Sequence, residues 1–141
     1  MTMSTVMLQP VVALVLWTFV MWLWMYVTRI PAIQRMNLKL DPQVPPRELM
    51  NQLPARVRWK ADNYNHLFEM PTLFYAVALS LALLGDATSG SVILAWAYVG
   101  LRVVHSVFQA TVNKIEVRFA LFALSSLLLL ALTVRAAMAV F

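Results

Sequence analysis

Apolar residues fall into four long runs along the chain, each separated from the next by a polar stretch. A helix that crosses a bilayer needs about 20 mostly apolar residues, because the hydrocarbon core is about 30 Å thick. The second run reaches this length only when it is extended backwards through several polar residues. The pattern therefore predicts a four-helix membrane bundle, with spans at about residues 6–28, 57–84, 91–112 and 117–140 and a loop at about 29–56.

Composition supports this prediction. Hydrophobic residues make up 62% of the 141 residues and charged residues only 12%, whereas soluble domains have about 45–50% apolar and about 25% charged residues. No charged residue precedes Arg29, and no small-residue cleavage site follows the first run, so we expect a retained span and not a signal peptide. Residues 1–141 are thus expected to form a single all-α membrane domain that contacts membrane lipids.

The basic residues are distributed unevenly among the connections. Seven of the eleven Lys and Arg residues lie between Arg29 and Lys60, none lies in the second connection, and Lys114 and Arg118 lie in the third. The positive-inside rule then places the first and third connections in the cytoplasm and both termini on the non-cytoplasmic side. The net charge of +5 therefore reflects topology, and we expect no nucleic-acid partner.

Two of the expected spans carry a polar stripe. The second has polar residues at i, i+4, i+7 and i+11: Arg58, Asp62, Asn65 and Glu69. The third has them at i, i+3, i+7 and i+11: Arg102, His105, Gln109 and Asn113. The helical rise places Glu69 and Arg102 at similar depth, which predicts an ion pair. Such stripes either fix the register of packed helices or line a polar cavity, and the spacing alone allows both.

These polar residues also carry a resemblance. The segment from Arg56 to Phe74, followed by Arg102-Val-Val-His105 and by Arg118, resembles the MAPEG superfamily, the membrane-associated proteins of eicosanoid and glutathione metabolism. The resemblance is to its bacterial-type members that are similar to microsomal glutathione transferases. It implies a homotrimer in a bacterial inner membrane, with glutathione as co-substrate bound between neighbouring subunits. Because the chain has no cysteine, the reacting thiol would belong to glutathione.

The resemblance also implies roles for individual residues. Arg118 would stabilise the glutathione thiolate and is the expected catalytic residue, and no metal is implied. Contacts to glutathione would come from polar residues of the second and third spans: Arg58, Asn65, Glu69, Arg102, His105 and Gln109. Three positions depart from the family. When its Arg-x-x-x-Asn-x-x-Glu pattern is aligned on Glu69, Asp62 and His66 replace the Arg and the Asn, whereas alignment on Pro71 recovers Asn65 but loses the Glu and the Arg. Gln109 replaces a family Tyr.

The implied function is a transferase or peroxidase-like enzyme. It would activate glutathione as a thiolate and conjugate it to, or use it to reduce, an apolar electrophile from the lipid phase. The alternative is a non-catalytic lipid-binding or scaffold protein of the same family, in which the polar stripes only fix the subunit interface. Two other hypotheses are an exporter with Glu69 as proton carrier, which the strong charge bias disfavours, and a haem protein with His66 and His105 as ligands.

Overall fold

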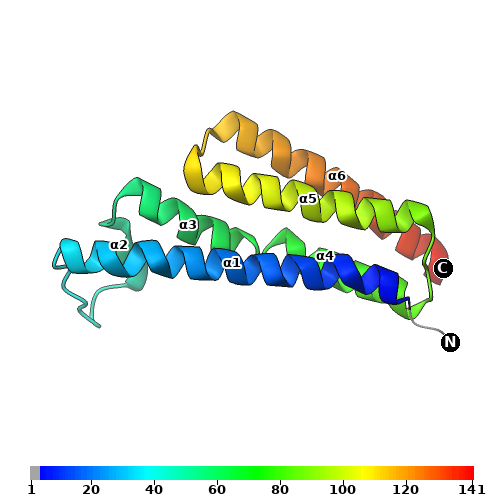
Figure 1. The fold of residues 1–141 in the computed structure, drawn as a ribbon, viewed down its shortest axis with the longest axis horizontal. Coiled ribbons are helices and arrows are strands. Elements are labelled where there is room, and N and C mark those ends of the chain that lie inside the picture. Colours follow the sequence, from blue (N-terminus) through cyan, green and yellow to red (C-terminus); the bar gives the residue numbers. More distant parts are fainter. Residues whose placement is uncertain (1–3) are drawn as a thin grey trace.

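The structure is a computed structural model that describes residues 4–141, and within that range all the regular secondary structure is helical. Its elements are α1 (Thr5–Arg35), α2 (Pro46–Asn51), α3 (Ala55–His66), α4 (Met70–Leu83), α5 (Ser89–Thr111) and α6 (Ile115–Val140) (Figure 1). Together α3 and α4 form one membrane-crossing stretch. Over the described residues, four helical stretches are long and apolar enough to cross a membrane, which confirms the predicted four-span architecture.

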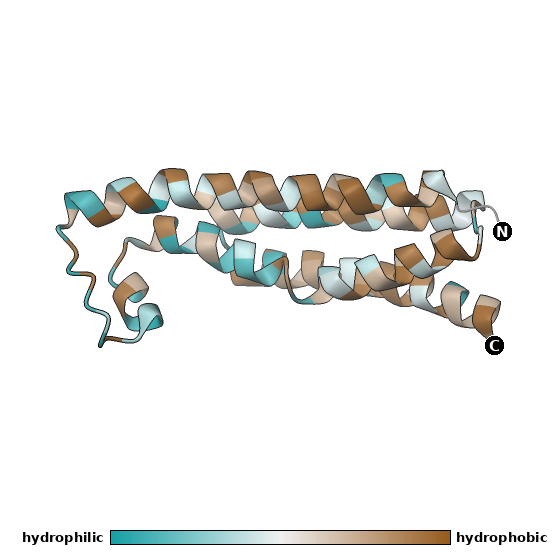
Figure 2. Ribbon diagram, turned by 90° about the horizontal axis from the view of Figure 1, so that it is seen from below, coloured by the Kyte–Doolittle hydropathy of each residue, from teal (hydrophilic) through white to brown (hydrophobic). Residues whose placement is uncertain are grey.

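The long helices run side by side, with both termini at one end of the bundle and α2 at the other (Figure 1). Helix α5 packs most extensively against α6, and α1 packs against α3, α4 and α5. The shared core is apolar and includes Leu14, Phe74, Leu81, Tyr98 and Leu132. Hydrophobic residues also cover the outer faces of the helices (Figure 2). A surface of this kind suits contact with lipid or with further subunits.

The first helix continues beyond the expected end of the first span. It runs to Arg35, so the segment from Arg29 to Arg35, expected to belong to the loop, is helical. Charged side chains at the end of a span reach the headgroup region without interrupting the helix, because they need only water or lipid phosphates as partners. The helix ends two residues before Asn37, which adopts the left-handed conformation with φ of 47°.

The second span, in which Pro71 predicts a kink, is broken outright: the helix that carries the polar stripe ends at His66 and does not reach Glu69. Its two halves are separated by residues 67–69, and Glu69 lies outside the helical region at φ −92° and ψ −100°. Pro71 explains the break, because its ring excludes the carbonyl of Leu67 from the helical position and it has no N–H to donate. The backbone N–H and the hydroxyl of Thr72 both donate to the Glu69 carbonyl. Glu69 is therefore out of register with the polar stripe of α3.

The turn between α4 and α5 is organised by a carboxylate. The chain reverses at Gly85, whose φ is 74°, and the next residue, Asp86, accepts hydrogen bonds from the Thr88 N–H (2.8 Å) and the Ser91 hydroxyl (2.7 Å). Arg135 of α6 reaches the same hydroxyl at 3.5 Å. Burial raises the pKa of Asp86, but these hydrogen bonds and the Arg135 charge outweigh it, so the pKa of Asp86 is lowered.

Candidate functional site

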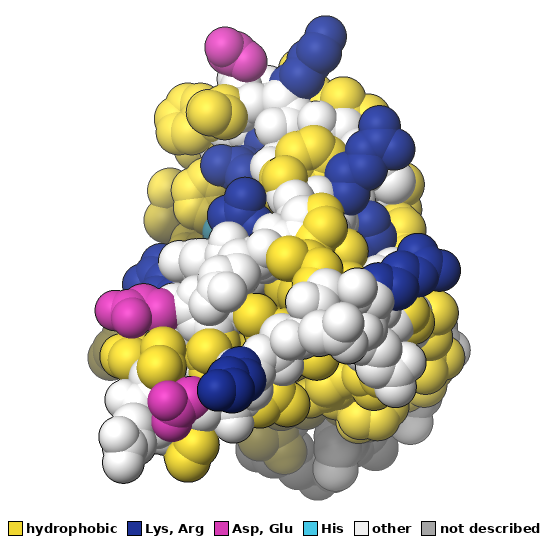
Figure 3. Space-filling view, turned by 90° about the vertical axis from the view of Figure 1, so that its left-hand side faces the viewer, with side chains coloured by type: hydrophobic (Ala, Val, Ile, Leu, Met, Phe, Trp, Pro, Cys, Tyr) yellow, Lys and Arg dark blue, Asp and Glu magenta, His cyan; other side chains and the backbone are white. Residues whose placement is uncertain are grey.

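The end of the bundle opposite the termini is strongly basic. It is formed by the end of α1, by α2 and by the start of α3, the segment that holds seven of the eleven Lys and Arg residues. In Figure 3, which faces this end, lysine and arginine side chains are spread over the surface with few acidic ones between them. A surface of this charge attracts anions, and it lies directly over the cavities described next.

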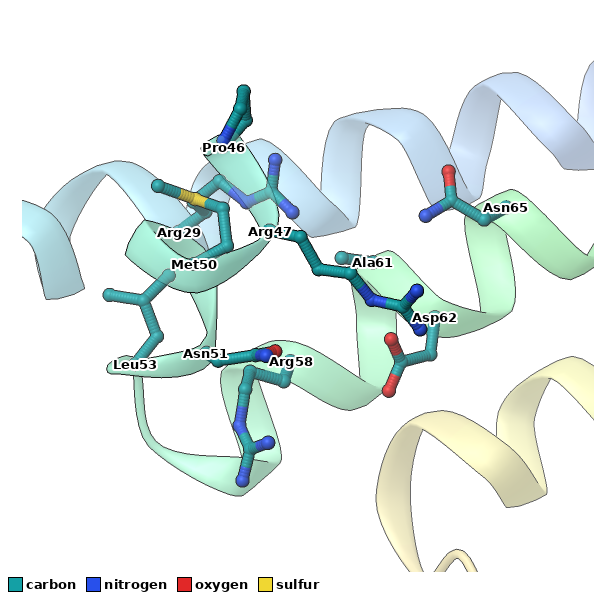
Figure 4. Close-up of a pocket in the computed structure, with 10 residues that line it drawn as sticks. All are labelled: Arg29, Pro46, Arg47, Met50, Asn51, Leu53, Arg58, Ala61, Asp62 and Asn65. Carbon is teal, nitrogen blue, oxygen red and sulfur yellow. The ribbon is translucent and has the colours of Figure 1, made fainter. Parts of the chain in front are cut away.

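The first cavity, which we name the basic cavity, has a volume of about 590 Å³ and lies between the end of α1, α2 and α3 (Figure 4). Three guanidinium groups line it, from Arg29, Arg47 and Arg58, together with Asp62 and Asn65. The Nε atoms of Arg29 and Arg58 are buried and have no hydrogen-bond partner among residues 4–141. The basic cavity thus brings together three arginines, the residue type that best binds carboxylates and phosphates.

A second cavity, the mixed-charge cavity, adjoins the first and has a volume of about 380 Å³. It is lined by charged and polar residues of α2, α3, α5, α6 and the break in the second span: Arg47, Asp62, His66, Glu69, Gln109 and Arg118. Arg47 and Asp62 line both cavities, so the two polar cavities are neighbours. Groups of both signs in one cavity suit a ligand that itself carries both signs.

A third cavity, the aromatic cavity, has a volume of about 220 Å³. It is lined by His66, His105, Ile115, Arg118, Phe119 and Phe122. Two of these residues, His66 and Arg118, also line the mixed-charge cavity. The Nη1 atom of Arg118 donates to Asn113 Oδ1 at 2.7 Å, which holds the guanidinium at the start of α6. Arg118 therefore stands where a polar cavity meets an apolar one.

The expected pair between Glu69 and Arg102 does not form within residues 4–141. The Glu69 carboxylate instead lies 2.9 Å from His66 Nδ1, and its side chain is 66% exposed. The guanidinium of Arg102 and both ring nitrogens of His105 are buried and have no hydrogen-bond partner in the described part of the chain. The break before Pro71 accounts for this correction, because the depth argument assumed an unbroken helix as far as Glu69.

The His66 ring lies against other aromatic rings. Its centroid is 5.0 Å from that of His105 and 5.5 Å from that of Phe122. Two imidazoles in contact leave no room for a porphyrin between them, so this arrangement does not fit the haem hypothesis. Among the described residues, no group of three or more His, Cys, Asp or Glu side chains is arranged to hold a metal ion.

Two hydrogen bonds join α3 to α5 close to the mixed-charge cavity, which Gln109 also lines. Asn63 Nδ2 donates to Gln109 Oε1 at 2.8 Å, and both residues are buried. Lys60 Nζ donates to the Ala110 carbonyl at 3.1 Å and lies 5.2 Å from the centroid of the Trp24 ring. Gln109, for which a ligand contact was predicted, thus uses its carbonyl oxygen to join two helices. No periodicity in the sequence indicates Asn63 as its partner.

Fold and cavities together define a four-span membrane protein with a charged site at one end of its bundle. The model of the MAPEG family matches residues 7–138, nearly the whole chain. The chain therefore belongs to the MAPEG family, as its sequence resemblance indicated. Neither the comparison with curated proteins nor the comparison with solved structures yields a match.

Arg58, Asp62 and Asn65, which the sequence places on one helical stripe at i, i+4 and i+7, all line the basic cavity. Arg29 and Arg47 complete that cavity and were not singled out from the sequence. The sequence indicated only that both arginines belong to the basic segment between the first and second spans. Which arginines of that segment face the cavity depends on how α2 folds against α3.

Proposed function

We propose that this protein is an integral membrane enzyme, a glutathione transferase or peroxidase-like member of its family. Glutathione binds as co-substrate in the polar cavities, and its sulfur lies beside Arg118. One observation carries the proposal: Arg118 and His66 line both the mixed-charge cavity and the aromatic cavity. A hydrophilic thiol and an apolar electrophile can therefore meet at one point.

The chemistry of the cavities matches that of glutathione. The tripeptide carries two carboxylates and one ammonium group, so it needs cationic and anionic partners at once. Arg47 and Arg58 supply guanidinium groups for the carboxylates, and Asp62 supplies a carboxylate for the ammonium. Asn65, in the basic cavity, supplies an amide for the peptide groups. All of these residues line one or both of the two neighbouring polar cavities.

Arg118 supplies the charge that activates the thiol. A guanidinium within a few Å of a thiol favours its thiolate form, which is the nucleophile. The hydrogen bond to Asn113 keeps the guanidinium in place without neutralising it, because an amide carries no charge. Arg118 therefore stays available to a ligand anion.

The apolar substrate arrives from the lipid. Ile115 and Phe119, which line the aromatic cavity, are 68% and 66% exposed on the outer surface of the bundle. An electrophile dissolved in the bilayer thus reaches the aromatic cavity sideways, without crossing water. The thiolate attacks it there, and the conjugate leaves towards the lipid or the basic end.

The proposed assembly is a homotrimer in a bacterial inner membrane. The mixed-charge cavity is bordered by the exposed Glu69 side chain, and a neighbouring subunit closes this side in the proposed trimer. Large apolar residues exposed on α1, α5 and α6 provide the contact surface. The basic end faces the cytoplasm, where glutathione is available, and both termini face the opposite side.

The proposal is tested by replacing Arg118 and a matched arginine of the same helix. In nanodiscs, with glutathione and an aryl halide as electrophile, Arg118→Ala is expected to lower kcat/KM by about 100-fold, the usual effect of losing one charge-stabilising donor. Arg135→Ala, at the other end of α6, is expected to stay within about twofold of the parent, because such a surface change leaves the site intact. Equal activities for the two variants would reduce Arg118 to an interfacial anchor.

The alternative, a non-catalytic lipid-binding or scaffold protein, is favoured by one observation. Gln109 stands at the position of a family Tyr, and its carbonyl oxygen accepts a hydrogen bond from Asn63, so it acts in helix packing. A scaffold of this kind binds no glutathione, so titration calorimetry with glutathione distinguishes the two functions. Heat of binding at one site per subunit supports the enzyme.

A further inference from the structure

We propose that His66, oriented by Glu69, is the base that accepts the proton of the glutathione thiol. The inference rests on the proposed function, because it specifies how that same site deprotonates its thiol. His66 is then a catalytic residue beside Arg118, and Glu69 is a positioning residue. The contact between these two side chains, at the edge of the mixed-charge cavity, carries the argument.

The contact determines which ring nitrogen is basic. His66 Nδ1 lies 2.9 Å from Glu69 Oε2. A carboxylate accepts hydrogen bonds and has no proton to donate when ionised, so the Nδ1–H of His66 is the donor. The neutral imidazole then has its free lone pair on Nε2, which makes this atom the proton acceptor. An ionised Glu69 also stabilises the imidazolium that forms, as carboxylates do in acid–base catalysis.

The position of the His66 ring is determined by its neighbours on α5, α6 and the break in the second span. His66 ends α3, and the break that follows lets Glu69 lie close against it. The rings of His105 and Phe122, 5.0 Å and 5.5 Å away, support the imidazole on α5 and α6. Its side chain remains 19% exposed and lines both cavities that Arg118 lines. A thiol placed against Arg118 therefore lies beside this imidazole.

Arg118 cannot perform this step itself. An arginine side chain is always protonated in proteins, so it stabilises a thiolate but has no site for the departing proton. The ionisable groups that face His66 are of both signs: Arg47, Asp62, Glu69, Arg102, His105 and Arg118. Of these, the Glu69 carboxylate is in hydrogen-bond contact with the ring, at 2.9 Å from Nδ1.

The proposed step is balanced in protons and electrons. The S–H bond of glutathione breaks, its proton forms an N–H bond at His66 Nε2, and the electron pair remains on sulfur. This pair then forms the bond to the electrophilic carbon, while the leaving group departs with the pair of the bond that breaks. The imidazolium returns its proton to the leaving group or to water, so no oxidant or reductant takes part.

The test follows thiolate absorbance and proton release together. Protein in nanodiscs is mixed with glutathione near pH 7 in weakly buffered solution that contains a pH indicator. The parent is expected to release well under one proton per thiolate, because His66 keeps it. His66→Asn is expected to form the thiolate about 100-fold more slowly, the usual effect of losing a general base. Each thiolate that this variant forms releases one full proton.

Two carboxylate variants separate positioning from structure. Glu69→Gln leaves the imidazole and its aromatic neighbours in place, so it tests the inference even when His66→Asn does not fold. It is expected to slow thiolate formation about tenfold and to move the midpoint of the pH–rate profile to lower pH, because the imidazolium loses its anionic partner. Glu116 has an exposed carboxylate in the first turn of α6. Glu116→Gln is therefore expected to have the parental rate of thiolate formation and the parental midpoint of the pH–rate profile.

The possible failures are distinguishable. A parent that releases one full proton per thiolate, or a folded His66→Asn variant with the parental rate, overturns the role of His66 and leaves glutathione activation intact. An unchanged pH–rate midpoint in Glu69→Gln overturns the positioning role. A parent that binds no glutathione and forms no thiolate contradicts the proposed function, and the inference falls with it.

Discussion

The hydrogen bond between Asn63 and Gln109 leads to a prediction that is independent of any ligand. The two side chains are 0% and 6% exposed, and Asn63 Oδ1 has no hydrogen-bond partner among the described residues. Gln109→Leu keeps a side chain of similar size but removes the acceptor of the Asn63 amide. A buried amide without any partner costs about 1–3 kcal/mol. We therefore expect Gln109→Leu to lower the free energy of unfolding by about this amount.

The magnitude specific to the pair comes from a double-mutant cycle. Asn63→Leu leaves Gln109 at the edge of the mixed-charge cavity, where water reaches it, so its cost is expected to be smaller. In the double variant neither polar side chain remains, so its free energy of unfolding is expected to fall by less than the sum of the two single losses. Hydrogen bonds between membrane helices have coupling energies that average about 0.6 kcal/mol and reach about 1.7 kcal/mol. We expect a value in the upper half of that range.

The assay is reversible unfolding in mixed micelles, with helicity followed by circular dichroism as the denaturing detergent is added. Ser80→Ala is the matched control, because its hydroxyl is exposed and, within residues 4–141, bonds only to the Ala76 carbonyl of its own helix. Its effect is expected to stay within about 0.5 kcal/mol. If the double variant loses as much free energy of unfolding as the two single variants together, Asn63 and Gln109 do not interact, and the contact between α3 and α5 is refuted.

Three further predictions concern the rest of the molecule. The pKa of Asp86 is lowered from its ordinary value of 3.8 in the folded protein. The ionised carboxylate therefore stabilises the fold fully above pH 3.8, and this stabilisation is lost as the pH falls through the lowered pKa. Asp86→Asn should make the melting temperature less sensitive to pH in this acidic range. A reporter enzyme fused after Phe141 should be active only on the non-cytoplasmic side, and cytoplasmic activity would invert the proposed topology. Mass measurement in nanodiscs should give three copies, whereas a monomer would leave the mixed-charge cavity open.

The four spans could be predicted from the sequence because they depend on a property that a single run of residues carries. About 20 apolar residues in succession have no stable place outside a bilayer or a large core. The buried face of α5 could be predicted for a similar reason. Arg102, His105 and Gln109 share one face at helical spacing, and all three are buried as polar groups inside the bundle.

The details of the site depend on relations that periodicity does not contain. Pro71 indicated a disturbance in the second span, but the direction in which Glu69 turns depends on the backbone conformation of the break. The contact of Glu69 with His66, in place of Arg102, follows from that conformation. The partner of Gln109 lies 46 residues away in the sequence. Arg47 belongs to the basic cavity only because α2 folds against α3.

The central claim, that this protein activates glutathione at Arg118, is tested most directly by ultraviolet difference spectroscopy. Purified protein in nanodiscs is mixed with saturating glutathione at neutral pH, and the absorbance band of the bound thiolate is recorded. We expect about one thiolate per occupied site in the parent and in Arg135→Ala, and none in an Arg118→Ala variant of the same assembly mass and thermal stability. A parent that shows no thiolate band while glutathione is bound would contradict the claim.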